Sequence, residues 1–536
     1  MTSAGSDGDA PSGTPQPIDP KNPDGPAPLS RGELQDRAIH GASWTLVNVI
    51  FGVGVGFLVN ILLARVLGVV DYGRLAYLTM IIGLAGSIAG MGVGSGTLQF
   101  GAKAHSAGRR TEVQSLLSKS QGFRLMVAAP IMTVVVVALV RVDWVLLVLA
   151  VVFGIWVSAF FAGAATCLGI ENKTAGGAKN ALVINLLTQV AVVLAAVTVG
   201  TSDSIWAARI IVGALGAGTA MVLISPWYRR AVLRPTFPWG FPEGFWRFAL
   251  PTAAAGLVGS LLSNRSEVAV LTWMSAEHAA GIFALAYGLS AHLFSPAQAL
   301  IGPLIPAVSG LHEVDPSAVG RALGRTLRSA ATVAGALMAT IMPSLALLIP
   351  LIYGAEFAEV SPVMLVLAMG GAISILGGPL SAFVAARLQG SRLFRVSVIS
   401  LALNVGLMVP LIPIIGIWGA VVGNIAGTLG QTVALLRGEV RTLGVSPRSV
   451  VADLLPIGVG GFVGWVVWWG MGLIGLSAVA SAVLGGVAGG VLFLSVLAVA
   501  RVGLTMGDVN AIRRAVPRIA RGPGGHLLTL LGRRVG

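Results

Sequence analysis

Long apolar segments follow one another along most of this chain, and short polar connections separate them. A helix needs about 20 apolar residues to cross a hydrocarbon core of about 30 Å, because each residue adds about 1.5 Å. The pattern therefore predicts an all-α, polytopic membrane protein with about 14 transmembrane helices, expected at residues 40–66, 73–95, 119–141, 144–169, 179–200, 205–227, 246–273, 280–307, 325–352, 360–386, 394–414, 417–437, 450–472 and 477–501.

Basic residues are concentrated in the two terminal segments and in every second connection, which together hold 30 of the 35 lysines and arginines. Translocating Lys or Arg is costly, so the connections that carry them stay in the cytoplasm. We therefore expect a multi-pass protein of the cytoplasmic (plasma) membrane with both termini in the cytoplasm. The basic residues outside this pattern are Arg65, Arg74, Arg141, Arg209 and Arg265.

Composition agrees with a membrane protein and excludes several function classes. Only 10% of the residues are charged, against about 25% in soluble domains. The net charge of +14 lies beside the predicted spans, so we expect membrane lipids and no nucleic acid as partners. A single cysteine, Cys167, rules out an internal disulfide, and the sequence has no nucleotide-binding loop or metal-ligand cluster. We therefore expect no cofactor and no enzymatic activity.

An internal repeat divides the membrane region. Gly73 and Gly281 occupy corresponding positions, 208 residues apart, in two similar stretches. An even number of predicted spans separates the copies, so both enter the membrane in the same orientation, as in transporters built from two parallel lobes. We predict an N-lobe (residues 40–230, helices 1–6) and a C-lobe (residues 231–437, helices 7–12) around a central cavity.

The remaining segments lie outside this pseudo-symmetry. Residues 450–501 are expected to add helices 13 and 14. Residues 1–39 are rich in Pro, Gly, Ser and Asp, a composition that predicts a disordered cytoplasmic tail. Residues 502–536 form a basic cytoplasmic tail, either an amphipathic helix on the inner leaflet or a solvated segment.

Several short strings, in order and spacing, resemble bacterial oligosaccharide flippases. They cover roughly residues 40–437 and are Leu62–Gly68, Asp71–Gly73, Phe245–Pro251, Leu261–Asn264, Leu351–Phe357 and Gly416–Ala420. The family is the polysaccharide (O-antigen type) flippase branch of the multidrug/oligosaccharidyl-lipid/polysaccharide exporter superfamily. The resemblance implies movement of an undecaprenyl-diphosphate-linked saccharide from the inner to the outer leaflet. It also implies a polysaccharide polymerase and glycosyltransferases as candidate partners.

Polar residues within the predicted spans are the candidates for the substrate pathway, since each costs free energy there unless it is paired or faces water. They are Asn48, Asn60, Arg65, Asn264, Arg265, Glu267 and Gln298. In our interpretation Arg265 faces the cavity and attracts the diphosphate, because a guanidinium fork fits phosphate oxygens. Glu267 then pairs with a cation across the lobe interface, for which Arg65 is a candidate.

Structural alternatives stand beside each interpretation. Glu267 also suits an ion pair between helices, and Arg265 and Arg65 also suit snorkelling toward the membrane surface. Asn48 and Asn60 share one face of the first helix, which suits helix packing or a cavity wall. The amides further along, Asn404 and Asn424, are interpreted mainly as packing residues of the C-lobe.

Three other functions compete with the oligosaccharide flippase. A lipid II flippase is one, because the two extra helices resemble the fourteen-span arrangement of that group. A cation-coupled multidrug exporter of the same superfamily would need acidic residues in the cavity, and Glu267 is the only carboxylate well inside a predicted span. A membrane glycosyltransferase or polymerase would need a sizeable hydrophilic loop with catalytic carboxylates, and no predicted connection has one.

Overall fold

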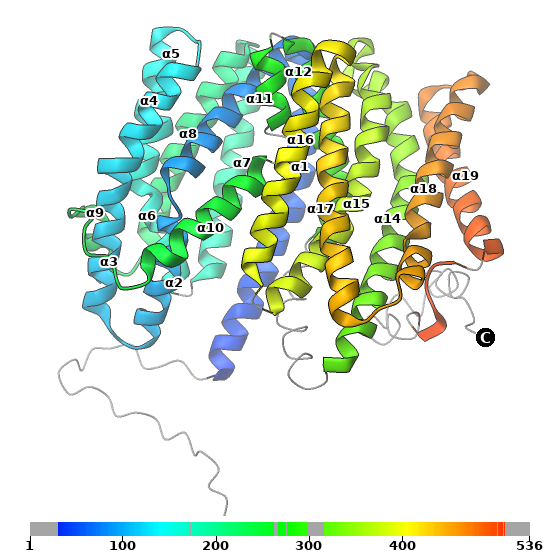
Figure 1. The fold of residues 1–536 in the computed structure, drawn as a ribbon. Helices are drawn as coiled ribbons and strands as arrows, with labels where there is room; N and C mark the ends of the chain where they lie inside the picture. The colour runs from blue at the N-terminus through cyan, green and yellow to red at the C-terminus, as the bar shows by residue number, and fades with distance from the viewer. Residues whose placement is uncertain are drawn as a thin grey trace, which may run out of the picture.

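The structure is a computed structural model and consists of helices joined by short connections (Figure 1). No β-strand occurs among the residues it describes, and the predicted all-α class is confirmed. A helix satisfies its backbone hydrogen bonds internally, which a segment in lipid requires. The residues described are 31–171, 173–261, 266–274, 276–298, 316–387, 389–500, 502–507 and 509.

The first half of the chain supplies the following elements, in which η1 and η2 are π-helical turns within longer helices. They are α1 Arg31–Ala89, α2 Val93–Ser106, α3 Arg110–Phe123, η1 Arg124–Ala128, α4 Ala129–Leu139, α5 Trp144–Leu149, η2 Ala150–Val157, α6 Ser158–Ile170, α7 Thr174–Thr198, α8 Ser202–Leu223 and α9 Pro226–Leu233. In this half, α7 and α8 pack on α1, and α6 packs on α8.

The second half supplies a similar set and two further long helices. The elements are α10 Phe245–Ser260, α11 Ser266–Trp273, α12 Glu277–Gln298, α14 Pro316–Tyr353, η4 Ala355–Phe357, α15 Val360–Ala386, α16 Gly390–Ile415, α17 Ile417–Leu443, α18 Pro447–Ile474 and α19 Ala478–Ala500. Here α16 packs on α17, and α15 packs on α12, α14 and α17.

The predicted segments agree with these helices in position. Each of the fourteen overlaps one or more helices, and eleven helices in the described residues are long and apolar enough to cross a membrane. The chain is therefore a multi-pass helical protein, and the count of fourteen crossings stays a prediction.

The first long helix folds back on itself at Gly68. This residue has a φ of 70°, a conformation that glycine adopts without steric cost. Asn60 and Tyr72 are 12 residues apart, yet Asn60 Nδ2 donates a hydrogen bond to Tyr72 Oη over 2.8 Å. In a straight helix 12 residues would span about 18 Å. The two arms of α1 therefore lie side by side, and we call this end of the bundle the Gly68 end.

Two expected boundaries differ from the structure. Residues 31–39, expected in the disordered tail, form the first turns of α1, while residues 1–30 lie outside the described residues. The span expected to begin at residue 119 belongs to a helix that begins earlier, at Arg110, and continues through α3, η1 and α4. Polar side chains near the start of the expected span bind a neighbouring loop: Lys119 Nζ donates to Gly240 O over 2.7 Å.

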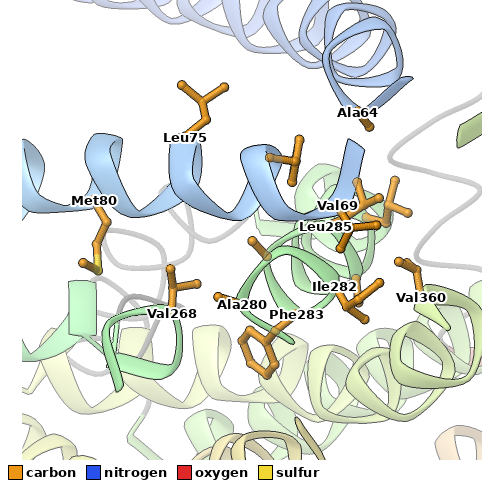
Figure 2. Packing of buried hydrophobic residues seen from close by; sticks show 14 of the residues in the cluster. Ala64, Val69, Leu75, Met80, Val268, Ala280, Ile282, Phe283, Leu285 and Val360 are labelled. Carbon is orange, nitrogen blue, oxygen red and sulfur yellow. The ribbon is translucent and has the colours of Figure 1, made fainter. Parts of the chain in front are cut away.

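The repeat glycines meet where the two halves touch. A Cβ at Gly281 of α12 would lie 2.1 Å from Val69 O of α1, and a Cβ at Gly73 would lie 2.8 Å from Gly281 N. Without side chains the backbones approach closely. Figure 2 shows Val69 of α1 beside Leu285 of α12, and both residues are buried. The positions that the repeat relates are thus in direct contact.

The two extra helices pack on α14 through small residues. A Cβ at Gly460 of α18 would lie 2.1 Å from Gly335 O, and a Cβ at Gly489 of α19 would lie 1.8 Å from Ala339 O. Ser344 Oγ also donates to Ala482 O over 2.7 Å. Both extra helices are therefore attached to one helix of the second half.

Candidate functional site

A buried carboxyl group lies at the centre of the C-lobe. Glu267 is in the first turn of α11, is 0% exposed, and receives hydrogen bonds from two other helices. Asn404 Nδ2 of α16 donates to its Oε1 over 2.8 Å, and Asn424 Nδ2 of α17 donates to the same oxygen over 2.6 Å. Ser266 Oγ lies 3.0 Å from Oε2. A buried acid needs such donors, and these three connect α11 with α16 and α17.

Arg65 does not pair with Glu267, contrary to the prediction. Its guanidinium donates to the backbone oxygens of Leu351 and Ile352 at the end of α14. The last carbonyl groups of a helix have no partner within the helix and carry partial negative charge, so they attract a cation. Amide donors replace the expected cation at Glu267, and Arg65 instead joins α1 to the other lobe.

The lobes are closed against each other at the Gly68 end. Arg65 makes its hydrogen bonds to α14 here. The Glu356 carboxyl group of η4 also lies close to Gly68: a Cβ atom added to this glycine would be 3.5 Å from it. The contact between Gly73 and Gly281 lies in the same region. Backbone, cation and apolar contacts from both lobes therefore meet on this side.

A group of polar side chains lies at the boundary between the lobes. Asn60 and Tyr72 from the two arms of α1 hydrogen-bond to each other, and Tyr353 ends α14 from the other lobe. Tyr72 and Tyr353 belong to the same cluster of buried residues. Arg209 of α8 lies 3.5 Å from Thr79 Oγ1, about two helical turns from Tyr72 on the same arm of α1. We call Asn60, Tyr72 and Tyr353 the junction cluster.

The other end of the bundle has a different arrangement. α10 leaves the C-lobe and lies against α2 of the N-lobe, visible in Figure 1 as an oblique helix beside α2. A Cβ at Gly92 would lie 2.1 Å from Ala249 O, and a Cβ at Gly96 would lie 2.7 Å from the Phe245 ring. α10 therefore bridges the lobes here, while α11 stays attached to the C-lobe through Glu267.

Four predicted pathway residues have no described side chain. Asn264 and Arg265 lie outside the described residues and directly precede α11 in the chain. Asn48 lies on α1 and Gln298 on α12, and the side chains of both are outside the description. Their roles stay predictions, while Glu267 belongs to the C-lobe interior and Asn60 and Arg65 belong to the lobe boundary.

Sequence reasoning missed part of the site. Tyr72 and Tyr353 were quoted within the strings that carry the family resemblance but not as pathway candidates, and Asn404 and Asn424 were interpreted as packing residues. Two features of the sequence could have identified them. These polar side chains lie in apolar segments, and the buried acid Glu267 needs hydrogen-bond donors. Which amide meets which acid depends on helix packing, so the pairing itself was not predictable.

A half-buried arginine was also missed, because it was counted in a connection. Arg124 begins the π-helical turn η1, and its Nη2 donates to Thr166 Oγ1 of α6 over 3.0 Å. Cβ atoms at Gly94 and Gly163 would lie 3.6 and 3.2 Å from its terminal nitrogens, so these glycines leave room for it. Among the described residues it has no carboxylate partner, and it holds α2, α3 and α6 together.

The site has no feature of a metal centre. No group of three or more His, Cys, Asp or Glu residues with metal-binding geometry occurs in the part of the chain that the structure describes.

Comparison with known proteins identifies a family for the chain. Residues 38–312 match the family described as "Polysaccharide biosynthesis protein". No curated protein matches the sequence. The match to the family spans about half of the chain and includes the repeat glycines and Glu267.

Two solved structures share the fold. The "Lipid II flippase MurJ, inward closed conformation" has 13% sequence identity and a TM-score of 0.63, over 84% of this chain and 98% of that one. The "Inward-facing conformation of a multidrug resistance MATE family transporter of the MOP superfamily" has 14% identity and a TM-score of 0.55, over 76% and 99%. At these identities the likeness establishes the fold.

Proposed function

The chain belongs to the polysaccharide biosynthesis protein family, and from this premise we propose that it is a flippase for lipid-linked oligosaccharide. It moves undecaprenyl-diphosphate-linked saccharide from the inner to the outer leaflet of the cytoplasmic membrane for cell-surface polysaccharide biosynthesis. The polymerase and the glycosyltransferases that use and make this saccharide are its proposed partners.

The observation that carries the proposal is the contact between the lobes at the Gly68 end. Two halves related by an internal repeat meet there through Gly73 and Gly281, and Arg65 adds hydrogen bonds across the boundary. Transporters of this type expose one site alternately to each side by moving one lobe against the other. With the Gly68 end facing outward, this conformation closes the path to the outer leaflet.

α10 and α11 make contacts on different sides of the lobe boundary. α11 is held in the C-lobe by Glu267, Asn404 and Asn424, whereas α10 lies against α2 of the N-lobe. Movement of one lobe therefore changes the position of α10 relative to α11 and leaves the buried hydrogen bonds of Glu267 intact. Arg265 directly precedes α11 in the chain, and its guanidinium would bind the diphosphate as the saccharide passes.

The environment of Glu267 argues against a multidrug exporter. A cationic drug needs an exposed negative charge, yet Glu267 is 0% exposed and both of its carboxyl oxygens already face amide or hydroxyl donors. A lipid II flippase is the second candidate, because α18 and α19 add two helices beyond the repeat and the MurJ fold matches over 84% of the chain. Both candidates carry a polyprenyl diphosphate.

The test is the leaflet distribution of undecaprenyl-linked saccharide in cells depleted of the protein. We expect the lipid-linked saccharide to accumulate in the inner leaflet and wild-type protein to reverse this. Arg265→Ala should fail to reverse it. Arg141→Ala removes an exposed arginine elsewhere and should restore the distribution. An unchanged leaflet distribution together with altered drug retention would favour the multidrug exporter.

A further inference from the structure

The junction cluster contains two buried polar atoms that have no hydrogen-bond partner among the described residues. Tyr353 is 1% exposed, and its Oη makes no hydrogen bond in the described part of the protein. Asn60 uses Nδ2 to reach Tyr72 Oη, but its own Oδ1 is buried and unpaired. Buried polar groups in proteins are nearly always hydrogen-bonded, so two orphans in one cluster require an explanation.

These atoms lie where the lobes separate. Asn60 and Tyr72 belong to α1 of the N-lobe, whereas Tyr353 is the last residue of α14. Tyr353 directly follows Leu351 and Ile352, whose backbone oxygens accept the hydrogen bonds of Arg65. Breaking these bonds and parting the lobes would separate Tyr353 from Tyr72 and expose both orphan atoms.

The chemistry of the cluster favours a neutral ligand rich in hydroxyl groups. Asn60 Oδ1 accepts, and a phenol both donates and accepts, so a group that does both can satisfy each of them. One charged group on this side is the Arg209 guanidinium, which contacts Thr79 on the same arm of α1 as Tyr72 and would repel a cationic ligand. Saccharide hydroxyl groups have the required donors and acceptors, and the phenol rings offer flat apolar faces.

We propose that Asn60, Tyr72 and Tyr353 form a subsite for saccharide hydroxyl groups, which is filled when the lobes part at the Gly68 end. The subsite rests on the proposed function and adds a contact for the sugar that is separate from the diphosphate contact of Arg265. In the closed state its polar atoms stay unpaired, and the arriving saccharide supplies the missing hydrogen bonds.

The test compares two probes on the purified full-length chain: undecaprenyl diphosphate and the same lipid linked to N-acetylglucosamine. Tyr353→Phe removes only the hydroxyl group. We expect it to weaken binding of the glycosylated probe about fivefold to tenfold, the effect of one lost hydrogen bond, and to leave binding of the bare lipid unchanged. Asn60→Leu, at the second orphan atom, should act in the same direction.

Thermal unfolding gives a second readout that a structural role would not produce. Since the Tyr353 hydroxyl is buried without a partner, Tyr353→Phe should leave the unfolding temperature unchanged or raise it. The matched control is Tyr77→Phe, on the same α1 arm as Tyr72, whose Oη lies 3.4 Å from Leu139 O within the N-lobe. This control should not change the ratio of the two affinities.

Three outcomes would overturn the subsite: equal loss of both probes, no loss of either, or a lower unfolding temperature for Tyr353→Phe. Failure of the wild-type chain to bind either lipid would instead contradict the proposed function itself. The affinity for the bare lipid thus tests the flippase, and the ratio of affinities tests the subsite.

Discussion

The two polar groups at the centre of this protein differ in completeness and in location. Around Glu267, both carboxyl oxygens have donors, and the contributing helices α11, α16 and α17 all belong to the C-lobe. In the junction cluster, Tyr353 Oη and Asn60 Oδ1 have none, and the residues come from both lobes. The C-lobe group keeps one orphan of its own, Asn404 Oδ1.

The difference indicates which contacts persist when the lobes move. A buried carboxyl group whose two oxygens both have donors holds the contributing helices together, because separating them leaves that group unpaired. At a boundary that opens, each additional hydrogen bond between the lobes would have to break during opening. The Glu267 group is therefore suited to hold a lobe together, and the junction cluster is suited to change partners.

The largest expected effect comes from preventing closure at the boundary. In Gly281→Val the new side chain begins 2.1 Å from Val69 O, so the lobes cannot approach. The rate at which a polar maleimide labels a cysteine at position 353 reports opening, since Tyr353 is 1% exposed and the native Cys167 is buried. We expect labelling to be at least about tenfold faster. This corresponds to a shift of roughly 1.4 kcal/mol in the free-energy difference between the closed and open states.

The control for this experiment lies on the same helix. A Cβ at Gly288 of α12 meets nothing within 4 Å, so Gly288→Val should leave the labelling rate unchanged. Equal rates in Gly281→Val and the parent protein would mean that the glycine contact does not hold the boundary closed.

An intermediate effect is expected when the C-lobe network loses a donor. Asn424→Leu removes the 2.6 Å hydrogen bond to Glu267 and should lower the free energy of unfolding by about 1–3 kcal/mol. Asn180→Leu is the control, because the Asn180 side chain accepts a hydrogen bond from Thr219 at a more exposed site. Both are measured by denaturant unfolding in detergent. If Asn424→Leu costs no more than its control, the Glu267 group does not stabilise the lobe.

The smallest expected effect comes from removing the Arg65 hydrogen bonds at the Gly68 end. Arg65→Gln replaces the charged donor to Leu351 and Ile352 and should raise the labelling rate at position 353 about threefold to tenfold, with stability nearly unchanged. Arg74→Gln breaks the 3.0 Å ion pair with Asp203 inside the N-lobe and should not change labelling. The same rise in both variants would show that arginine loss, and not the lobe boundary, causes the effect.

Much of the architecture was predictable from local patterns. The lengths of the apolar segments indicated membrane helices, and the resemblance of the stretches around Gly73 and Gly281 indicated a repeat. Glu267 was identified as important because an acid in an apolar segment needs a partner. Its partner was predicted incorrectly. The sequence indicates that this acid needs a hydrogen-bond donor, but it does not indicate which helix supplies the donor.

What the sequence alone determined is the helical membrane class, the division suggested by the repeat, and the positions at which polar chemistry interrupts apolar helices. These follow from burial in lipid, which acts on each segment separately. Only the tertiary structure decided that Asn404 and Asn424 satisfy Glu267, that Arg65 reaches α14, and that Tyr353 lies unpaired beside Tyr72. Those contacts join segments far apart in the chain, and helix packing sets them through close approach at residues such as Gly73 and Gly281.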